Sequence, residues 1–258
     1  ILTGSIMMGE GEDTLDYGCQ ASVTGSIKLG PGDDTFILRP TAVLPLSPDL
    51  DPGVGLDPGD GMDTLQLGAS LLAGSFNSGT VDLGDAELFD MLVIGEEDAP
   101  EPVTWQVSTS SPVQFNSGVI VHPGTTLSFD GQVEIEITAE IMADSPANFS
   151  QSPDSVMQFD LGQSIDDSFL DLTGSLTIEP LVSGDPDDLV TTVIVNYEGN
   201  IIAGDYTLIR ATEGITGEFD VEEFPTSSIF DFSAEFNTDG GSGHIYLLTV
   251  EQIAFYND

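Results

Sequence analysis

The amino-acid sequence predicts an all-β chain wound into a solenoid, specifically a parallel β-helix. Three observations predict it: a repeated turn motif, short strand-like segments bounded by Gly, Pro and Asp, and no stretch of sustained helical periodicity. The motif Gly-x-Gly-x-Asp-Thr-apolar occurs at residues 9–15, 30–36 and 59–65. A fixed period of roughly 20 residues, such as separates the first two copies, is typical of a solenoid.

Each copy of the motif predicts a corner between two strands. Its glycines allow the backbone to turn sharply or to approach a neighbour closely, and the Thr-apolar pair begins the next strand. Gly25-Ser26-Ile27 repeats Gly4-Ser5-Ile6 at the same offset, so we expect the chain to be a piece of a longer array. Coils of about 20 to 25 residues would give roughly ten to twelve coils and a rod on the order of 50 Å long.

The expected strands follow one another along the whole chain. The segment 133–137 alternates apolar and acidic residues, as half-buried strands do, and the apolar run 88–94 favours a buried strand over a helical turn. Residues 237–241 predict a hairpin-like turn between the last strands. In chain order the expected strands are 26–29, 35–38, 64–67, 79–83, 88–94, 103–107, 119–121, 123–129, 133–137, 156–161, 170–172, 175–178, 190–195, 205–210, 229–232 and 245–250.

The strand pattern suggests two regions. Residues 1–150 are predicted to be repeat coils, interrupted by a Pro- and Asp-rich loop at 39–62 that leaves the solenoid and returns at the third corner. Residues 151–258, where the strand-like segments are longer, are predicted to form C-terminal coils and a cap. β-sandwich modules are the alternative fold, because they also consist of short strands separated by turns.

The composition is strongly acidic. The chain has 45 Asp and Glu against 3 Lys and Arg, a net charge of −42. Nucleic acids and anionic membranes are bound by clustered basic residues, so neither is an expected partner. No apolar run is long enough for a transmembrane helix. So large a charge repels itself unless salt or divalent cations screen it, which indicates a saline or extracellular habitat, Ca²⁺ coordination, or both.

Four aspartates are candidate Ca²⁺ ligands. Asp13, Asp34 and Asp63 occupy the same place in the three motif copies, and Asp60 lies at the end of the acidic loop. Stacked corners would bring such carboxylates together, and like charges one coil apart need hydrogen bonds, protonation or a cation. In the alternative interpretation each aspartate caps its own turn through backbone N–H groups.

Catalysis is not expected. The segment Asn237-Thr238-Asp239, with Gly243-His244 nearby, is similar to pieces of the polygalacturonase signature, but that family also needs further paired aspartates and a basic substrate clamp. The chain has three basic residues in all, and an anionic polymer would be repelled. No Gly-x-Ser-x-Gly nucleophile elbow is present. A polysaccharide-degrading β-helix is therefore a minor alternative.

Trp105 allows two interpretations. An exposed tryptophan would suit a platform that binds carbohydrate or protein, whereas a large aromatic residue in a β-helix more often packs in the core. The second interpretation is favoured.

Several segments in order resemble the passenger domains of bacterial autotransporters and their β-strand-repeat relatives. The stretch 25–36 resembles the repeat of that family, and 88–93, Trp105 and 121–127 resemble the coils that follow. Residues 201–219, preceded by 171–176, resemble the closing coils.

The resemblance implies a right-handed parallel β-helix at the cell surface, with autochaperone-like C-terminal coils that help folding during secretion. Members of this family continue into a membrane β-barrel, and we expect that barrel to have been removed or replaced by another export route here. The expected function is a non-enzymatic, adhesin-like protein, surface-displayed or secreted, that presents binding loops to a surface protein or glycan of a host or neighbouring cell. The alternative is a structural subunit that self-associates into an extracellular fibre or surface layer, with Ca²⁺ assisting.

Overall fold

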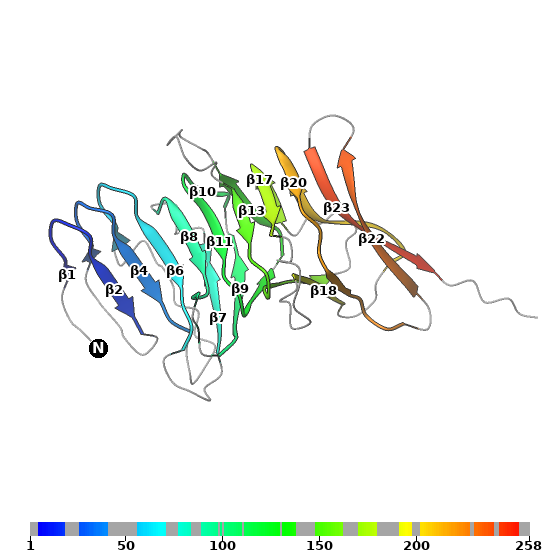
Figure 1. Ribbon diagram of the computed structural model, residues 1–258, viewed down its shortest axis with the longest axis horizontal. Coiled ribbons are helices and arrows are strands. Elements are labelled where there is room, and N and C mark those ends of the chain that lie inside the picture. Colours follow the sequence, from blue (N-terminus) through cyan, green and yellow to red (C-terminus); the bar gives the residue numbers. More distant parts are fainter. Residues whose placement is uncertain are drawn as a thin grey trace, which may run out of the picture.

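The chain forms a long stack of short β-strands, which the computed structural model shows end to end in Figure 1. All regular elements among the described residues are β-strands, and these residues contain no helix long and apolar enough to cross a membrane. The structure describes residues 5–18, 26–40, 56–70, 77–83, 89–97, 99, 101–109, 111–129, 131–137, 148–161, 170–179, 191–197, 202–227, 230–239 and 243–252.

The longest sheet, called here the first sheet, contains eight strands that pair in parallel from one end of the stack to the other. Its strands are, in spatial order, β2 (Thr14–Tyr17), β4 (Thr35–Leu38), β6 (Thr64–Leu67), β8 (Met91–Ile94), β11 (Gly118–Val121), β14 (Phe149–Gln151), β17 (Ser175–Ile178) and β20 (Gly214–Thr216).

Two further sheets of six strands each form the other faces of the stack. The second sheet consists of β7 (Ser78–Asp82), β9 (Val103–Ser108), β12 (Thr125–Phe129), β15 (Val156–Leu161), β18 (Thr192–Tyr197) and β21 (Val221–Glu223), all parallel. The third sheet consists of β10 (Val113–Phe115), β13 (Val133–Ile137), β16 (Leu170–Thr173), β19 (Gly204–Ala211), β23 (Gly243–Gln252) and β22 (Phe230–Asp239).

The first three turns of the chain add a small N-terminal sheet of three parallel strands. These are β1 (Ile6–Met7), β3 (Ile27–Lys28) and β5 (Leu56–Asp57). From β8 onward the chain visits the first, second and third sheets in turn, so that each strand pairs with the strand one coil away. This arrangement is the predicted parallel β-helix. It excludes the β-sandwich alternative, because sandwich sheets are antiparallel.

The coils are longer and fewer than the sequence predicted. One inward-facing column of the first sheet contains a residue from every coil: Leu15, Phe36, Leu65, Leu92, Val119, Phe149, Leu176 and Ile215. Its first step, from Leu15 to Phe36, keeps the spacing of the first two motif copies, and every later step spans more of the chain. The expectation of ten to twelve short coils is therefore wrong, and seven steps of about 4.8 Å give a stack of about 34 Å.

The core is a continuous apolar column enclosed by the three long sheets. Strands alternate inward apolar and outward polar residues, as in β9, where Val103, Trp105 and Val107 are buried and the residues between them are half-buried. Trp105 is fully buried, with its indole Nε1 donating to the carbonyl of Gly68 at 3.1 Å. The core interpretation of Trp105 is thus confirmed, and the exposed platform is wrong.

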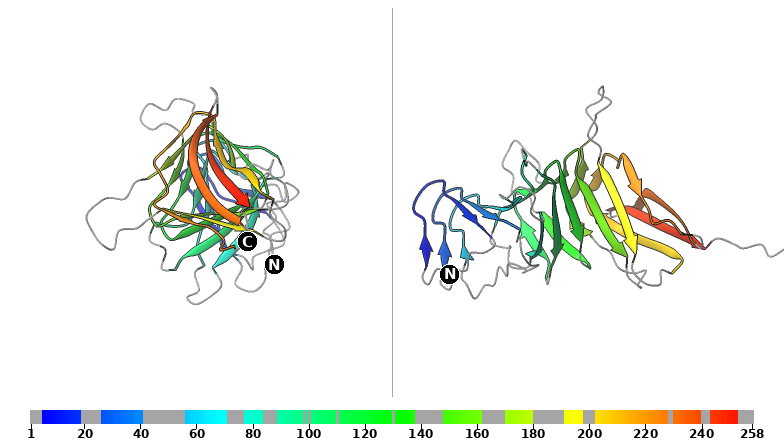
Figure 2. Two further views of the ribbon diagram at one scale, coloured as in Figure 1. Left: turned by 90° about the vertical axis from the view of Figure 1, so that its right-hand side faces the viewer. Right: turned by 90° about the horizontal axis from the view of Figure 1, so that it is seen from below.

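An antiparallel hairpin lies at the C-terminal end of the stack, opposite the N-terminal strands (Figure 2). β23 pairs antiparallel with β19, and β22 pairs antiparallel with β23 from Phe230↔Gln252 to Asp239↔Gly243. The predicted hairpin is therefore present, although Asn237 to Asp239 end a strand and do not form the turn. Phe236, Phe219 and Tyr246 pack together beneath it, with ring centroids 4.6 to 6.1 Å apart.

The β-helix continues without a break across residue 150, the expected boundary between the two predicted regions. β14 includes residue 150, and its neighbours on both sides belong to the same sheet. In the predicted loop 39–62, Leu56 and Asp57 already form β5, while residues 41–55 lie outside the described part of the chain.

Candidate functional site

The Gly-x-Gly-x-Asp turns stack directly on one another where the chain enters the first sheet. Gly30 and Gly32 have positive φ angles of 117° and 142°, and Gly59 and Gly61 repeat them one coil later. A Cβ atom built on Gly30 would lie 2.0 Å from the carbonyl oxygen of Gly9, and one on Gly61 would lie 2.1 Å from that of Gly32. Only glycine allows this contact, because any side chain would collide with the backbone of the preceding coil.

The aspartates of the three turns and Asp90 of the next coil form a column, named here the aspartate column: Asp13, Asp34, Asp63 and Asp90. Each carboxylate after the first accepts a hydrogen bond from the backbone N–H of the aspartate one coil earlier. The distances are 2.7 Å from Asp13 N to Asp34 Oδ1, 3.0 Å from Asp34 N to Asp63 Oδ1, and 3.0 Å from Asp63 N to Asp90 Oδ2. The column thus fastens four consecutive coils through charge-assisted hydrogen bonds.

The two ends of the column differ from its middle. At the N-terminal end, Asp13 Oδ2 accepts from Gly9 N at 3.0 Å and so caps its own turn. At the other end, the amide of Asn116 donates to Asp90 Oδ1 at 3.0 Å. The interpretation that each aspartate caps its own turn therefore fits Asp13, whereas Asp34 and Asp63 bind the turn of the preceding coil.

The two central carboxylates are almost completely buried. Asp34 and Asp63 each retain 1% of their accessible surface. Burial, together with the charges of Asp34, Asp90 and Asp33, raises the pKa of Asp63, and the hydrogen bond from Asp34 N opposes this shift. In Asp34 one oxygen is hydrogen-bonded to Asp13, but Oδ2 is buried without a hydrogen-bond partner.

The column contains three of the four aspartates predicted from the sequence. Asp60 does not belong to it: its side chain is exposed in the third turn, and its carbonyl oxygen accepts from Gly32 N at 2.8 Å. Sequence reasoning missed Asp90, which lacks the glycines of the motif. The signal was available in Asp90-Met91-Leu92, where an aspartate immediately precedes a strand of the first sheet, as in Asp63-Thr64-Leu65.

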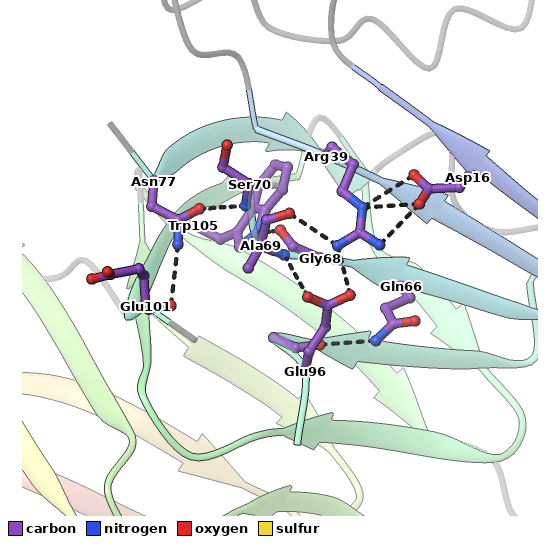
Figure 3. A network of polar contacts seen from close by, with 11 residues as sticks. Asp16, Arg39, Gln66, Gly68, Ala69, Ser70, Asn77, Glu96, Glu101 and Trp105 are labelled. Atoms are coloured by element: carbon purple, nitrogen blue, oxygen red, sulfur yellow. Dashed lines mark hydrogen bonds and ion pairs between the residues drawn. The ribbon is translucent and has the colours of Figure 1, made fainter. Parts of the chain in front are cut away.

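A second polar cluster surrounds Arg39, just after β4 (Figure 3). The guanidinium makes a bidentate ion pair with Asp16, with Nη2 3.0 Å from Oδ2 and Nε 3.0 Å from Oδ1. Its Nη1 donates to Glu96 Oε1 at 2.6 Å and to the carbonyl of Ala69 at 2.9 Å. Arg39 therefore joins segments from four consecutive coils.

The Arg39 cluster is a structural junction in which the arginine side chain is buried. The Arg39 side chain is 8% exposed, against 40% for Asp16 and 26% for Glu96. Burial alone would lower the pKa of Arg39, but hydrogen bonds to Asp16 and Glu96 outweigh it, so that the pKa is raised. A Cβ on Gly68 would lie 2.8 Å from Nη1, so a side chain at this position would have to displace the guanidinium. No sequence pattern indicated these partners, which lie 23 and 57 residues from Arg39.

All three basic residues of the chain bind carboxylates of other coils. Lys28 Nζ lies 2.6 Å from Asp57 Oδ2, and Arg210 Nη1 lies 2.8 Å from Asp171 Oδ2; Arg39 completes the set. Because the chain has 3 Lys and Arg in all, no basic side chain is left without a carboxylate partner. The protein therefore uses all three lysine and arginine side chains in contacts between coils.

Neither a protein-family model nor a curated protein matches the chain. Within the described residues, no three His, Cys, Asp or Glu side chains converge as a metal site. Asp239, the candidate residue of a polysaccharide hydrolase, ends β22 opposite Gly243 in the hairpin.

Proposed function

We propose that the protein is a non-enzymatic, adhesin-like β-helix, surface-displayed or secreted, whose rigid stack presents connecting loops to a partner. The partner would be a surface protein or glycan of a host or neighbouring cell, and the location would be extracellular. The resemblance to autotransporter passenger domains supports the same proposal. Residues 41–55, the part of the Pro- and Asp-rich segment that lies between β4 and β5 in the sequence, are the first candidate for the binding segment.

The observation that carries this proposal is the use of polar chemistry inside the stack. The aspartate column and the three basic residues connect one coil to the next. The core residues of the first sheet are buried in every coil between its two ends. These contacts support a scaffold role, because each of them holds neighbouring coils together.

The proposal can be tested by displaying the protein on beads and measuring their adhesion to cells. The critical variant replaces residues 41–55 with a short Gly/Ser linker, leaving β4 and β5 intact. We expect the variant to unfold at the same temperature as the parent but to lose adhesion. Equal adhesion by both proteins would exclude this loop, and no adhesion by the parent to any bacterial, epithelial or glycan-coated surface would argue against the adhesin role.

A structural subunit that polymerises end to end is the alternative. In such an assembly, a strand edge left uncovered in the complete protein would pair with another chain. The hairpin at the C-terminal end of the stack opposes head-to-tail growth. Sedimentation with Ca²⁺ and with EDTA separates the two roles: a monomer in both conditions excludes the fibre, whereas reversible Ca²⁺-dependent assembly supports it.

A further inference from the structure

One carboxylate oxygen in the aspartate column makes no hydrogen bond in the folded protein. Asp34 Oδ2 is buried without a hydrogen-bond partner in a residue that is 1% exposed. Its neighbour along the column, Asp63, is equally buried and also carboxylic. A buried charge is stable only when it is paired or hydrogen-bonded, and none of the three basic residues of the chain contacts this pair.

The same stacked turns provide a second set of oxygen atoms. The carbonyl oxygens of Gly9, Gly11, Gly30 and Gly32 each lie against a glycine of the next coil. Described N–H groups make no hydrogen bond to these four carbonyls. Carboxylate and carbonyl oxygens together are the donor set of hard divalent cations, above all Ca²⁺.

We propose that the stacked Gly-x-Gly-x-Asp turns bind a hard divalent cation between consecutive coils, with the carboxylates of Asp34 and Asp63 as its charged ligands. The ion neutralises two buried like charges and engages the free oxygen of Asp34. Because no group of three or more His, Cys, Asp or Glu side chains among the described residues is arranged to hold a metal ion, main-chain carbonyls and water complete the coordination. This site goes beyond the adhesin proposal and does not depend on it, since the ion would strengthen the stack whatever the loops bind.

The test is a Ca²⁺ titration of the whole chain by calorimetry, with thermal unfolding measured in parallel. Ionic strength is held constant with NaCl, so that general screening of the −42 charge is the same throughout. The critical variant is Asp34→Asn/Asp63→Asn, in which the amide oxygens can still accept from the backbone. The matched control is Asp231→Asn/Glu235→Gln, which removes two exposed charges from β22.

We expect the parent and the control to bind Ca²⁺ saturably, with a Kd of about 10⁻⁴ to 10⁻³ M as in extracellular modules, and to unfold at a higher temperature when it is bound. The Kd of the column variant for Ca²⁺ should be about tenfold higher or more. In EDTA it should be at least as stable as the parent, because two buried charges are gone. A merely structural role for the aspartates predicts the opposite: lower stability in EDTA and an unchanged response to Ca²⁺.

Two other results would overturn the proposal. The first is a response to Ca²⁺ that is the same in the parent and in the column variant, which would assign it to the acidic surface. The second is an absence of any saturable Ca²⁺ binding by the parent, with stability in EDTA that rises on acidification alone, which would make a proton the ligand of the pair.

Discussion

Arg39 and Glu96 are joined by a hydrogen-bonded ion pair of 2.6 Å although 57 residues separate them in the chain. Asp16 binds the other side of the same guanidinium from the opposite direction along the stack. In a chain with so few cations, this arginine is placed where one positive charge serves two carboxylates and a main-chain carbonyl.

Replacing Arg39 with Met should destabilise the protein strongly. The change leaves Asp16, Glu96 and the Ala69 carbonyl without their shared donor, and breaking a buried ion pair costs about 3 kcal/mol at the low end, which fits the partial exposure of these acids. The chain has one tryptophan, the buried Trp105, so its fluorescence can follow denaturant unfolding. Arg210→Met is the control: Arg210 is 42% exposed, and its loss should cost no more than about 1 kcal/mol.

Equal losses in the two arginine variants would contradict a special role for the Arg39 junction.

Gly30→Ala and Gly9→Ala test the stacking of the turns at the same motif position in two coils. At Gly30 the new Cβ meets the Gly9 carbonyl at 2.0 Å and φ is positive, whereas at Gly9 nothing lies within 4 Å. Overpacking and an unfavourable φ should each cost Gly30→Ala about 1 to 3 kcal/mol. Gly9→Ala should be close to neutral in the same unfolding experiment. A tolerated Gly30→Ala would show that the turns are farther apart than described.

The stability of the protein in EDTA should depend on pH through Asp63. The pKa of Asp63 is raised in the folded state by burial first and then by the charges of Asp34, Asp90 and Asp33. The folded protein therefore holds a proton that the unfolded chain releases, and stability is gained as pH falls from neutral through the raised pKa toward the ordinary value near 4.

Asp63→Asn should remove that contribution, since the amide is neutral at every pH. The measurement is the difference in free energy of unfolding between parent and variant from pH 7 to pH 4. The variant should be the more stable protein at pH 7, and the difference should shrink on acidification because protonation of Asp63 stabilises only the parent. Asp231→Asn, at an exposed position of β22, serves as the control for loss of one charge. A difference that stays constant with pH would mean that folding does not change the pKa of Asp63.

The stability of the protein should depend on pH in the alkaline range through Tyr246. Its ring is fully buried and its hydroxyl donates to Glu222 Oε1 at 2.6 Å; burial first, and then Glu222, raises the pKa of Tyr246 well above its usual range. Above a pH of about 10 the Tyr246 hydroxyl ionises in the unfolded chain but not in the folded protein, so the stability of the fold decreases as pH rises. Tyr246→Phe should lose about 1 kcal/mol at neutral pH and show a shallower alkaline decline. Parallel declines in parent and variant would refute the prediction.

The part of this structure that sequence could predict is the part governed by local chemistry. Gly30, Gly32 and Asp34 indicate a corner by their residue types alone, and the earlier copy of the motif at Gly9 indicates that the corner is stacked. The short apolar segments similarly mark most strands. The three motif aspartates could be expected in one column for the same reason, and Asp13, Asp34 and Asp63 do share it.

Other features depend on distances along the chain that no local pattern encodes. The third sheet begins with β10, a three-residue strand that was not among the expected ones. The partners of Arg39 follow from coil lengths, and these vary because insertions between strands have no fixed size. For the same reason the number of coils could not be counted from the first repeat. Asp90 was missed because the residues before it in the sequence lack the two glycines of the motif.

The inward column of the first sheet advances by one strand spacing per coil, in the short coil from Leu15 to Phe36 and in the long one from Leu176 to Ile215 alike. The height of the stack is thus counted in strands and is independent of how much chain each coil holds. Segments added between strands change the outline of the protein at one level and leave every other level in place. The connecting segments of such a chain can therefore change one at a time, while the number of stacked strands, and with it the length of the stack, stays the same.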